Sequence, residues 1–441
     1  MVMRMESGNE IRYRVWSPRA KMILMMLISL SIVFIGFLSE PTLSGAWDNL
    51  WQLLSHPNIL VVDSLYVASI SGTFLNVGLL CVCVTVLLWI NKAPFDGLNI
   101  AIIFTVMGFA FLGKNLINVW PILLGVYLYA KYKKEPFLNY INIAFLATAM
   151  SPVVTELLFH INFPITFRFP SSILIGILIG FIVPQAGAHF FKTSEGNNLY
   201  NIGFTAGIIV TIVAAVFRSF GYEHSPLWLV SYQYHNFLTI YILLMSTMLI
   251  ITSIVSDKNA IAYLMRLWKR PGTLLTDFVS LDGFSATILN MGITGIFCVL
   301  YIFLIGGQLS GAAVSGIFTV IGFSAAGNHI KNIIPIMAGI AFGSIFKLWN
   351  LSDTSTIMVS LFGTALAPIG GKFGFIFGAI AGFIHLSLVH QTGSFHAGMN
   401  LYNNGFAAGV VALFMTPFLN NFVKPRQLPE NLNDKYIIRT A

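Results

Sequence analysis

The chain has very few charged residues: Asp, Glu, Lys and Arg make up 9% of its 441 positions, against 56% hydrophobic residues. A soluble domain carries about 25% charged residues, so this composition excludes an ordinary water-exposed surface. Cysteine is scarce as well. Cys81, Cys83 and Cys298 all lie in apolar runs, and their spacing fits neither a metal site nor a disulfide framework. We therefore expect a polytopic membrane protein.

Several motifs of catalysis and nucleotide binding are also missing. The sequence has no phosphate loop, no G-x-S-x-G and no dinucleotide fingerprint. Its net charge of +8 does not come from a basic patch. Lys and Arg fall in short clusters between apolar runs, which is typical of the loops of membrane proteins. We expect no enzyme activity, no cofactor and no nucleic-acid partner.

Long apolar runs dominate the sequence. A membrane-spanning helix needs about 17–25 mostly apolar residues, because its backbone polar groups must be satisfied within the segment. Such runs predict an all-α polytopic fold. The fourteen segments are residues 22–38, 66–89, 98–113, 115–131, 138–158, 170–185, 199–219, 236–255, 284–305, 312–327, 331–346, 354–369, 373–389 and 399–420.

The basic residues predict the orientation of these segments. With the N-terminus inside, 20 of the 24 Lys and Arg residues fall on the inner side, as the positive-inside rule requires. The exceptions are Lys114, Arg168, Arg218 and Lys347. We expect a protein of the cell inner (cytoplasmic) membrane, surrounded by the lipid bilayer, with both termini in the cytoplasm and a retained signal-anchor helix.

A polar stretch occurs twice. GNNLYNIGFTAG (196–207) and GMNLYNNGFAAG (398–409) are identical at nine of twelve positions, and a shift of 214 aligns 63–125 with 277–339 without a gap. The chain is therefore predicted to be an internal duplication. Its expected parts are the cytoplasmic N-terminus with the signal-anchor helix (1–62), repeat 1 (63–220), a linker with one transmembrane helix (221–276), repeat 2 (277–420) and a cytoplasmic tail (421–441).

The two repeats are expected to have opposite orientations in the membrane. Each holds six segments, and one linker segment, 236–255, lies between them. Equivalent positions are thus seven segments apart, and seven is odd. This predicts two inverted repeats, an arrangement found in many transporters, with the binding site near the midplane between the repeats.

Interrupted helices predict where a solute binds. Segments 98–113 and 115–131, and their equivalents in repeat 2, are short and broken by Gly, Pro and polar residues. Breaking a helix in a membrane frees backbone groups that only a cavity or a protein partner can satisfy, and matched broken segments mark binding sites in transporters. The alternatives are full spans joined by tight turns, or re-entrant half-helices. The candidate residues here are Asn115, Asn118, Asn328, His329 and Asn332.

Four further polar residues in apolar segments are candidates for solute binding. Asn76 and Asn290 lie within spans, where an amide hydrogen-bonds either a solute or a neighbouring helix. Glu156 and Lys372 occupy equivalent places in the two repeats. Ionisable residues in or near the membrane mark functional sites, unless both lie at solvated turns.

The doubled polar stretch supplies the remaining candidates. Because the repeats are expected to be inverted, the two copies should lie at opposite faces of the membrane and line opposite vestibules of one path. The alternative is that each copy caps its own helix, since Asn is a favoured capping residue. The residues concerned are Asn198, Tyr200, Asn201, Asn400, Tyr402 and Asn403.

Two stretches resemble those of a known family. ATAMSPVVTELLF (147–159) followed by FPITFRFPSS (163–172) is similar to the segments of urea transporters, which are also inverted repeats. The doubled N-L-Y-N-x-G-F-x-A-G block resembles an uncharacterised family of duplicated bacterial multi-pass membrane proteins. The first resemblance implies a path for a small polar solute; the second implies no substrate.

We expect a channel or facilitator for a small polar solute. A second copy of the chain, in a homo-oligomer, is among the partners considered. One alternative is an ion- or proton-coupled secondary transporter that uses the two charged candidates above with Lys114 and Lys331. Another is an intramembrane enzyme built on His385, His390 and His396. Three convergent histidines would suit zinc, but we expect no metal site.

Overall fold

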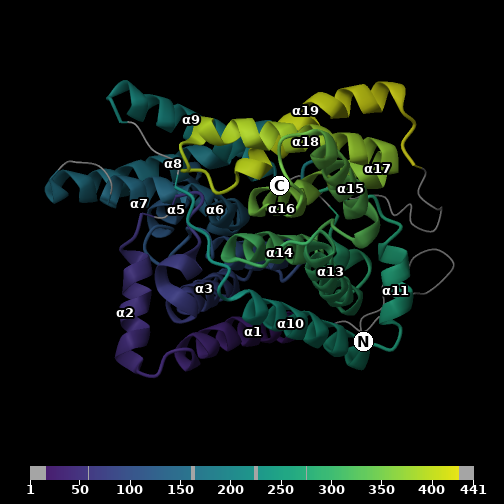
Figure 1. Cartoon of the computed structure of the whole chain (residues 1–441), viewed down its shortest axis with the longest axis horizontal. Helices are drawn as coiled ribbons and strands as arrows, with labels where there is room; N and C mark the ends of the chain where they lie inside the picture. The colour runs from purple at the N-terminus through teal and green to yellow at the C-terminus, as the bar shows by residue number, and fades with distance from the viewer. Residues whose placement is uncertain (1–15, 58, 160–163, 223–226, 275, 427–441) are drawn as a thin grey trace.

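The computed structural model describes residues 16–57, 59–159, 164–222, 227–274 and 276–426. Its regular secondary structure there is helical (Figure 1), and one isolated bridge pairs Val62 with Leu229. The α-helices are α1 (Pro18–Leu38), α2 (Leu43–Leu54), α3 (Ser64–Ile90), α4 (Gly97–Phe109), α5 (Trp120–Lys133), α6 (Ile141–Ala147), α7 (Ser151–Phe159), α8 (Ile165–Ser194), α9 (Asn201–Ser219), α10 (His235–Ser256), α11 (Ala260–Leu267), α12 (Phe278–Leu281), α13 (Phe284–Leu304), α14 (Gly311–Phe323), α15 (Ile330–Phe346), α16 (Thr354–Phe362), α17 (Ala367–Phe373), α18 (Phe375–Thr392) and α19 (Asn403–Phe422).

Ten helical stretches in the described part of the chain are long and apolar enough to cross a membrane. The number fourteen is therefore not confirmed. The four predicted segments that do not qualify are those described above as interrupted, and they form α4, α5, α14 and α15. A helix of 13 residues, such as α4, is about 20 Å long, which is less than the hydrocarbon thickness of about 30 Å.

The outer surface of these helices is apolar. On α8, the side chains of Leu174, Leu178 and Ile182 are each at least half exposed, and they recur every four residues along one face. Exposed apolar surface on this scale marks contact with a membrane or a partner. In a chain with ten apolar helices, lipid is the environment that this surface fits.

The two halves of the chain pack in the same way. α1 lies along α3, and α10 lies along α13 in the same manner. α5 packs on α8 as α15 packs on α18. α10 therefore packs in the second half as α1 packs in the first, although the sequence predicted it to be a linker segment. The repeated unit seen in the contacts begins with α1 and with α10.

Reciprocal hydrogen bonds join the halves. The Asp63 carboxylate accepts from the backbone N–H of Gly311 at the start of α14, at 2.8 Å. Asp277, its equivalent, accepts from the backbone N–H of Gly97 at the start of α4, also at 2.8 Å. Each aspartate also caps the helix that follows it in its own half. A capping carboxylate satisfies N–H groups that the helix itself leaves unpaired.

Replacing Asp63 by Ala should therefore destabilise the protein. Its carboxylate also accepts from the backbone N–H groups of Leu65 and Ser231, and a buried donor without a partner costs about 1–3 kcal/mol. We expect the free energy of unfolding in detergent to fall by that amount. Asp48→Ala on the exposed face of α2 is the control, and an equal effect of both changes would contradict a capping role.

The doubled polar stretches meet in the interior of the protein. Gly203 of α9 and Gly405 of α19 are so close that a Cβ on Gly203 would lie 2.8 Å from the Cα of Gly405. Phe204 and Phe406 stack beside this crossing, with ring centroids 5.7 Å apart. Small residues allow such close helix crossings in membranes. The expected placement in opposite vestibules is therefore wrong: the two copies are buried and in contact with each other.

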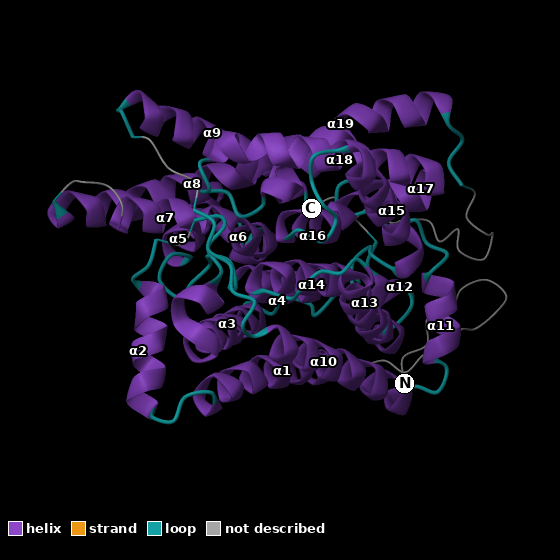
Figure 2. Ribbon diagram, in the orientation of Figure 1, coloured by secondary structure: helices purple, strands orange, loops and turns teal. Residues whose placement is uncertain are grey.

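Two short helices lie at opposite ends of the molecule. α2 stands at one end and α11 at the other, both across the direction of α1 and α10 (Figure 2). α2 buries Ala46, Leu50 and Leu53 on one face while Trp47 and Trp51 are exposed on the other. Aromatic side chains of this kind are enriched at membrane–water interfaces, so the exposed tryptophans of α2 fit a membrane surface.

Candidate interior site between the two halves

The candidate site is built around two buried turns that follow the short helices. The first turn, residues 110–119, joins α4 to α5, and the second turn, residues 324–329, joins α14 to α15. Most of their residues are fully buried, including polar ones. Non-helical backbone is tolerated inside a membrane protein only where protein or a water-lined cavity satisfies it. The turns lie where the interrupted segments predicted a break.

Asn118 and Asn332 shape these turns from equivalent positions. The Asn118 amide donates to the carbonyl of Gly113 at 2.8 Å, and the Asn332 amide donates to the carbonyl of Gly327 at 2.9 Å. Both glycines have a positive φ, 132° and 140°, a backbone region that favours glycine. In this structure both candidate asparagines bond to their own turns.

Asn76 and Asn290 support the same turns from neighbouring helices. The Asn76 amide donates to two backbone carbonyls of the first turn, those of Ala110 and Lys114. The Asn290 amide donates to the equivalent carbonyls of Ser324 and Asn328, at 2.8 Å each. These amides therefore bridge helices, the packing alternative considered for them.

In the first turn, Lys114 contacts the doubled stretch of the opposite half. Its Nζ atom donates to the hydroxyl of Tyr402 at 3.0 Å. The ammonium lies 4.9 Å from the centroid of the Tyr402 ring and 5.6 Å from that of Phe109. The side chain is fully buried, although topology counting placed Lys114 on the outer side. A lysine in the interior is thus enclosed by two aromatic rings.

In the second turn, a neutral residue takes the position that Lys114 has in the first. Asn328 occupies the position equivalent to Lys114, and its amide donates to the hydroxyl of Thr364 at 3.3 Å. The Tyr200 hydroxyl lies 3.3 Å from the same threonine oxygen. Tyr200 also packs against Phe323, with centroids 4.6 Å apart. Thr364 was not a candidate in the sequence, although its recurrence in ATAMSP and GTALAP was a usable signal.

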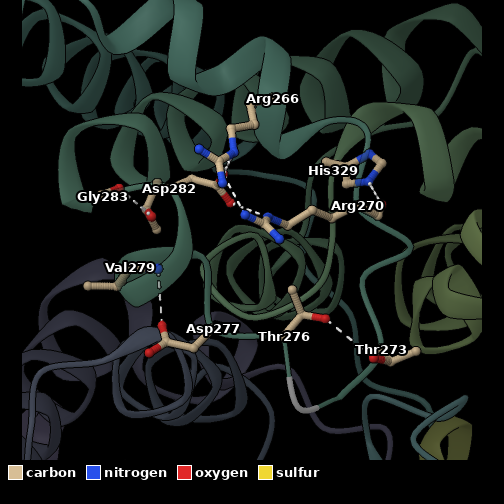
Figure 3. A network of polar contacts seen from close by, with 10 residues as sticks. Arg266, Arg270, Thr273, Thr276, Asp277, Val279, Asp282, Gly283 and His329 are labelled. Carbon is tan, nitrogen blue, oxygen red and sulfur yellow. Dashed lines mark hydrogen bonds and ion pairs between the residues drawn. The ribbon is translucent and has the colours of Figure 1, made fainter. Parts of the chain in front are cut away.

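The flanking candidates have separate partners. Asn115 accepts from the backbone N–H groups of Ile117 and Asn118 within the first turn. At the equivalent position, the His329 ring Nε2 lies 2.9 Å from the backbone carbonyl of Arg270. This contact attaches the second turn to the loop that follows α11 (Figure 3).

Within the doubled stretches, the asparagines mostly satisfy the local backbone and nearby side chains. Asn198 accepts from the backbone N–H of Tyr200, and Asn400 accepts from that of Tyr402, at 3.0 Å in each case. The other two candidates each contact a hydroxyl at the end of the preceding helix. They are Asn201 with Ser194, and Asn403 with Thr392. Asn403 also lies 2.9 Å from the ring Nδ1 of His396.

The charged and histidine candidates do not form one site. Glu156 is buried and accepts from the hydroxyl of Tyr222, whereas Lys372 donates to Asn420 near the end of α19. His390 stacks on Trp349. Among the residues that the structure describes, no three His, Cys, Asp or Glu side chains are placed to hold a metal ion.

The two ends of the molecule differ in their polar groups. At the α11 end, Arg270 makes two hydrogen bonds to Asp282, of 2.6 and 3.1 Å, and Arg266 lies 3.7 Å from the same carboxylate (Figure 3). At the α2 end, a polar pocket of about 510 Å³ is lined by residues that include Asn49 and Gln52. The equivalent of Asp282 there is Ala68, so no carboxylate occupies that position in the first half.

These features define a class of protein: a polytopic all-helical membrane protein made of two similar halves that meet at buried polar turns. The chain belongs to the family described as "Protein of unknown function (DUF1576)", whose model matches residues 43–219 and 256–421, one stretch in each half. No curated protein and no solved structure matches the chain.

Proposed function

We propose that the protein is a membrane channel or facilitator for a small polar solute, whose path runs between two inverted halves. The observation that carries this proposal is the pair of buried turns. Each presents polar side chains to a tyrosine of the opposite half, Lys114 to Tyr402 and Asn328 towards Tyr200. Matched helix breaks at the interface of two repeats are where transporters bind solutes.

The positions of α2 and α11 support the inverted arrangement. α1 leads into α2 at one end of the molecule, and α10 leads into α11 at the opposite end (Figure 1). α1 and α10 are equivalent by their packing, so they run in opposite directions. Five of the ten candidate spans belong to each half, and an odd number reverses the orientation of the second half. The short helices on either side of each turn then act as re-entrant pairs.

The alternatives have less support. A coupled transporter built on Glu156, Lys372, Lys114 and Lys331 would need these groups near a common path. Lys114 bonds to Tyr402 in the interior, whereas Glu156 and Lys372 each have a different partner elsewhere. The enzyme alternative needs a cluster of reactive groups, and among the described residues no three His, Cys, Asp or Glu side chains are placed to hold a metal ion. A facilitator needs only a polar path, which the two turns and their tyrosines would line.

Flux through proteoliposomes tests the proposal. The purified protein should accelerate swelling driven by small neutral solutes such as urea or formamide, and a proton ionophore should leave the rate unchanged. Thr364→Val keeps the shape of the side chain but removes the hydroxyl that contacts Asn328 and Tyr200. We expect flux to fall about three- to tenfold, the effect of roughly 0.7–1.4 kcal/mol.

Thr211→Val is the matched control, because its hydroxyl donates to a carbonyl within its own helix. This change should leave flux unaltered. The proposal fails if the wild-type protein does not exceed empty liposomes for any small solute, polar or charged. The interior path fails if Thr364→Val transports like the wild type.

A further inference from the structure

The Lys114 amine is buried, and no carboxylate of the described residues serves as its counter-charge. The residue is fully buried, and its hydrogen bond goes to a neutral hydroxyl, that of Tyr402. Across the described residues, no carboxylate forms an ion pair with it. An ammonium has three N–H donors, and burying such an ion without compensation is strongly unfavourable. Two aromatic faces offset only part of this cost.

The fold does not require the charge. At the equivalent position of the second turn, Asn328 is equally buried and neutral. The surroundings are otherwise alike: Tyr402 packs on Phe109 at 4.5 Å, and Tyr200 packs on Phe323 at 4.6 Å. An amide therefore suffices to complete this turn, and the lysine adds a positive charge that packing does not explain.

Neighbouring residues add further unpaired donors. The Nδ2 groups of Asn115 and Asn400 are buried and have no hydrogen-bond partner within the described structure. Asn115 follows Lys114 directly, and Asn400 lies two residues before Tyr402. Unpaired N–H donors therefore remain in the two segments that carry Lys114 and Tyr402, whereas buried polar groups are nearly always paired. A bound group that brings acceptor atoms and negative charge would correct both deficits.

We propose that Lys114 forms the centre of a binding site for a small monovalent anion, with Tyr402 as a second contact. Asn115 and Asn400, which lie in the same two segments of the chain, carry the unpaired amide donors. The anion must be small, because Phe109 stacks on Phe362 at 5.1 Å beside the site. A role for this anion site in transport rests on the proposed path between the halves. Anion binding itself is tested separately from transport.

Binding is tested on the purified full chain in detergent. Formate, nitrate and chloride are each compared with an equal ionic strength of a bulky anion such as gluconate, and calorimetric binding and the thermal unfolding midpoint are measured. We expect at least one small anion to bind and raise the midpoint. Lys114→Met should weaken binding at least about tenfold, and Lys114→Arg should retain it. Lys133→Met, on the exposed end of α5, is the control for charge.

The outcomes separate the two proposals. If Lys114→Met does not fold, Lys114→Asn, which copies the second turn, takes its place. Small anions that bind no better than gluconate, or equally to Lys114→Met and wild type, overturn the anion site. Neutral solutes that cross proteoliposomes in that case leave the path between the halves intact. Anion binding without any flux would instead support the site and remove the path.

Discussion

Replacing Asp282 by Ala is expected to lower the free energy of unfolding by about 3–5 kcal/mol. Its carboxylate accepts two hydrogen bonds from the guanidinium of Arg270, and both side chains are almost completely buried. Removing the carboxylate leaves a buried positive charge without this partner, which costs more than an intact pair contributes. The thermal unfolding midpoint and the denaturant midpoint in detergent measure the loss.

Two further variants identify the cause of that loss. Asp282→Leu combined with Arg270→Met removes both charges while keeping apolar volume, and should recover most of the stability, because buried ion pairs are often replaceable by apolar residues. Asp353→Ala, at an exposed position, should change the free energy of unfolding by less than about 0.5 kcal/mol. A double variant as unstable as Asp282→Ala would mean that packing, rather than unpaired charge, sets the effect.

The sequence predicted the membrane class and the duplication because both depend on composition and residue order. It missed α2 and α11 for a physical reason. Each is shorter than a membrane-spanning helix, which needs about 17–25 residues: α2 has 12 residues and α11 has 8. A search for long, uniformly apolar runs passes over such helices. Because the sequence did not show these two helices, it did not show that α1 and α10 begin equivalent units. α10 was therefore assigned to a linker.

The sequence predicted where along the chain the helices are interrupted, but not how deeply the candidate residues are buried. The breaks at Asn118 and Asn332 coincide with the buried turns. The doubled stretches, however, were assigned to opposite faces, because counting segments treats every run as a full span. The close approach of Gly203 and Gly405 instead brings them together. Such a contact depends on how helices tilt, which is set by packing between distant segments and not by hydropathy.

Lys114 shows what the sequence leaves open. Charge counting alone placed it in an outer loop, because a basic residue between two apolar runs is normally a solvated turn. Its burial follows from the short length of α4, which ends inside the protein, and from Tyr402, which lies 288 positions away in the sequence. Only the comparison of the two turns, lysine in one and asparagine in the other, shows that the charge is not required by the fold.

The proposed inverted arrangement predicts that cysteines introduced on α2 and after α11 are labelled from opposite sides of the membrane. α2 and α11 occupy equivalent places in the two halves and opposite ends of the molecule (Figure 2), so cysteines near them should face opposite sides of the membrane. Asp48 on α2 and Lys269 after α11 are both exposed. We expect Asp48→Cys to react with a membrane-impermeant maleimide in spheroplasts. Lys269→Cys should react only after the membrane is opened, since basic residues favour the cytoplasmic side.

Native cysteines provide the control. Cys81 and Cys298 are buried and Cys83 is half-buried, so a Cys83→Ser background should remain unlabelled on either side. Labelling of both introduced cysteines from the same side would mean that the halves are parallel and that each contains an even number of spans. Each pair of short helices would then have to cross the membrane once, as one broken span. The buried turns would lose their role as the ends of re-entrant pairs. Labelling from opposite sides requires an odd number of membrane crossings in each half. The five candidate spans of each half give an odd number only if each pair of short helices returns to the side from which it entered.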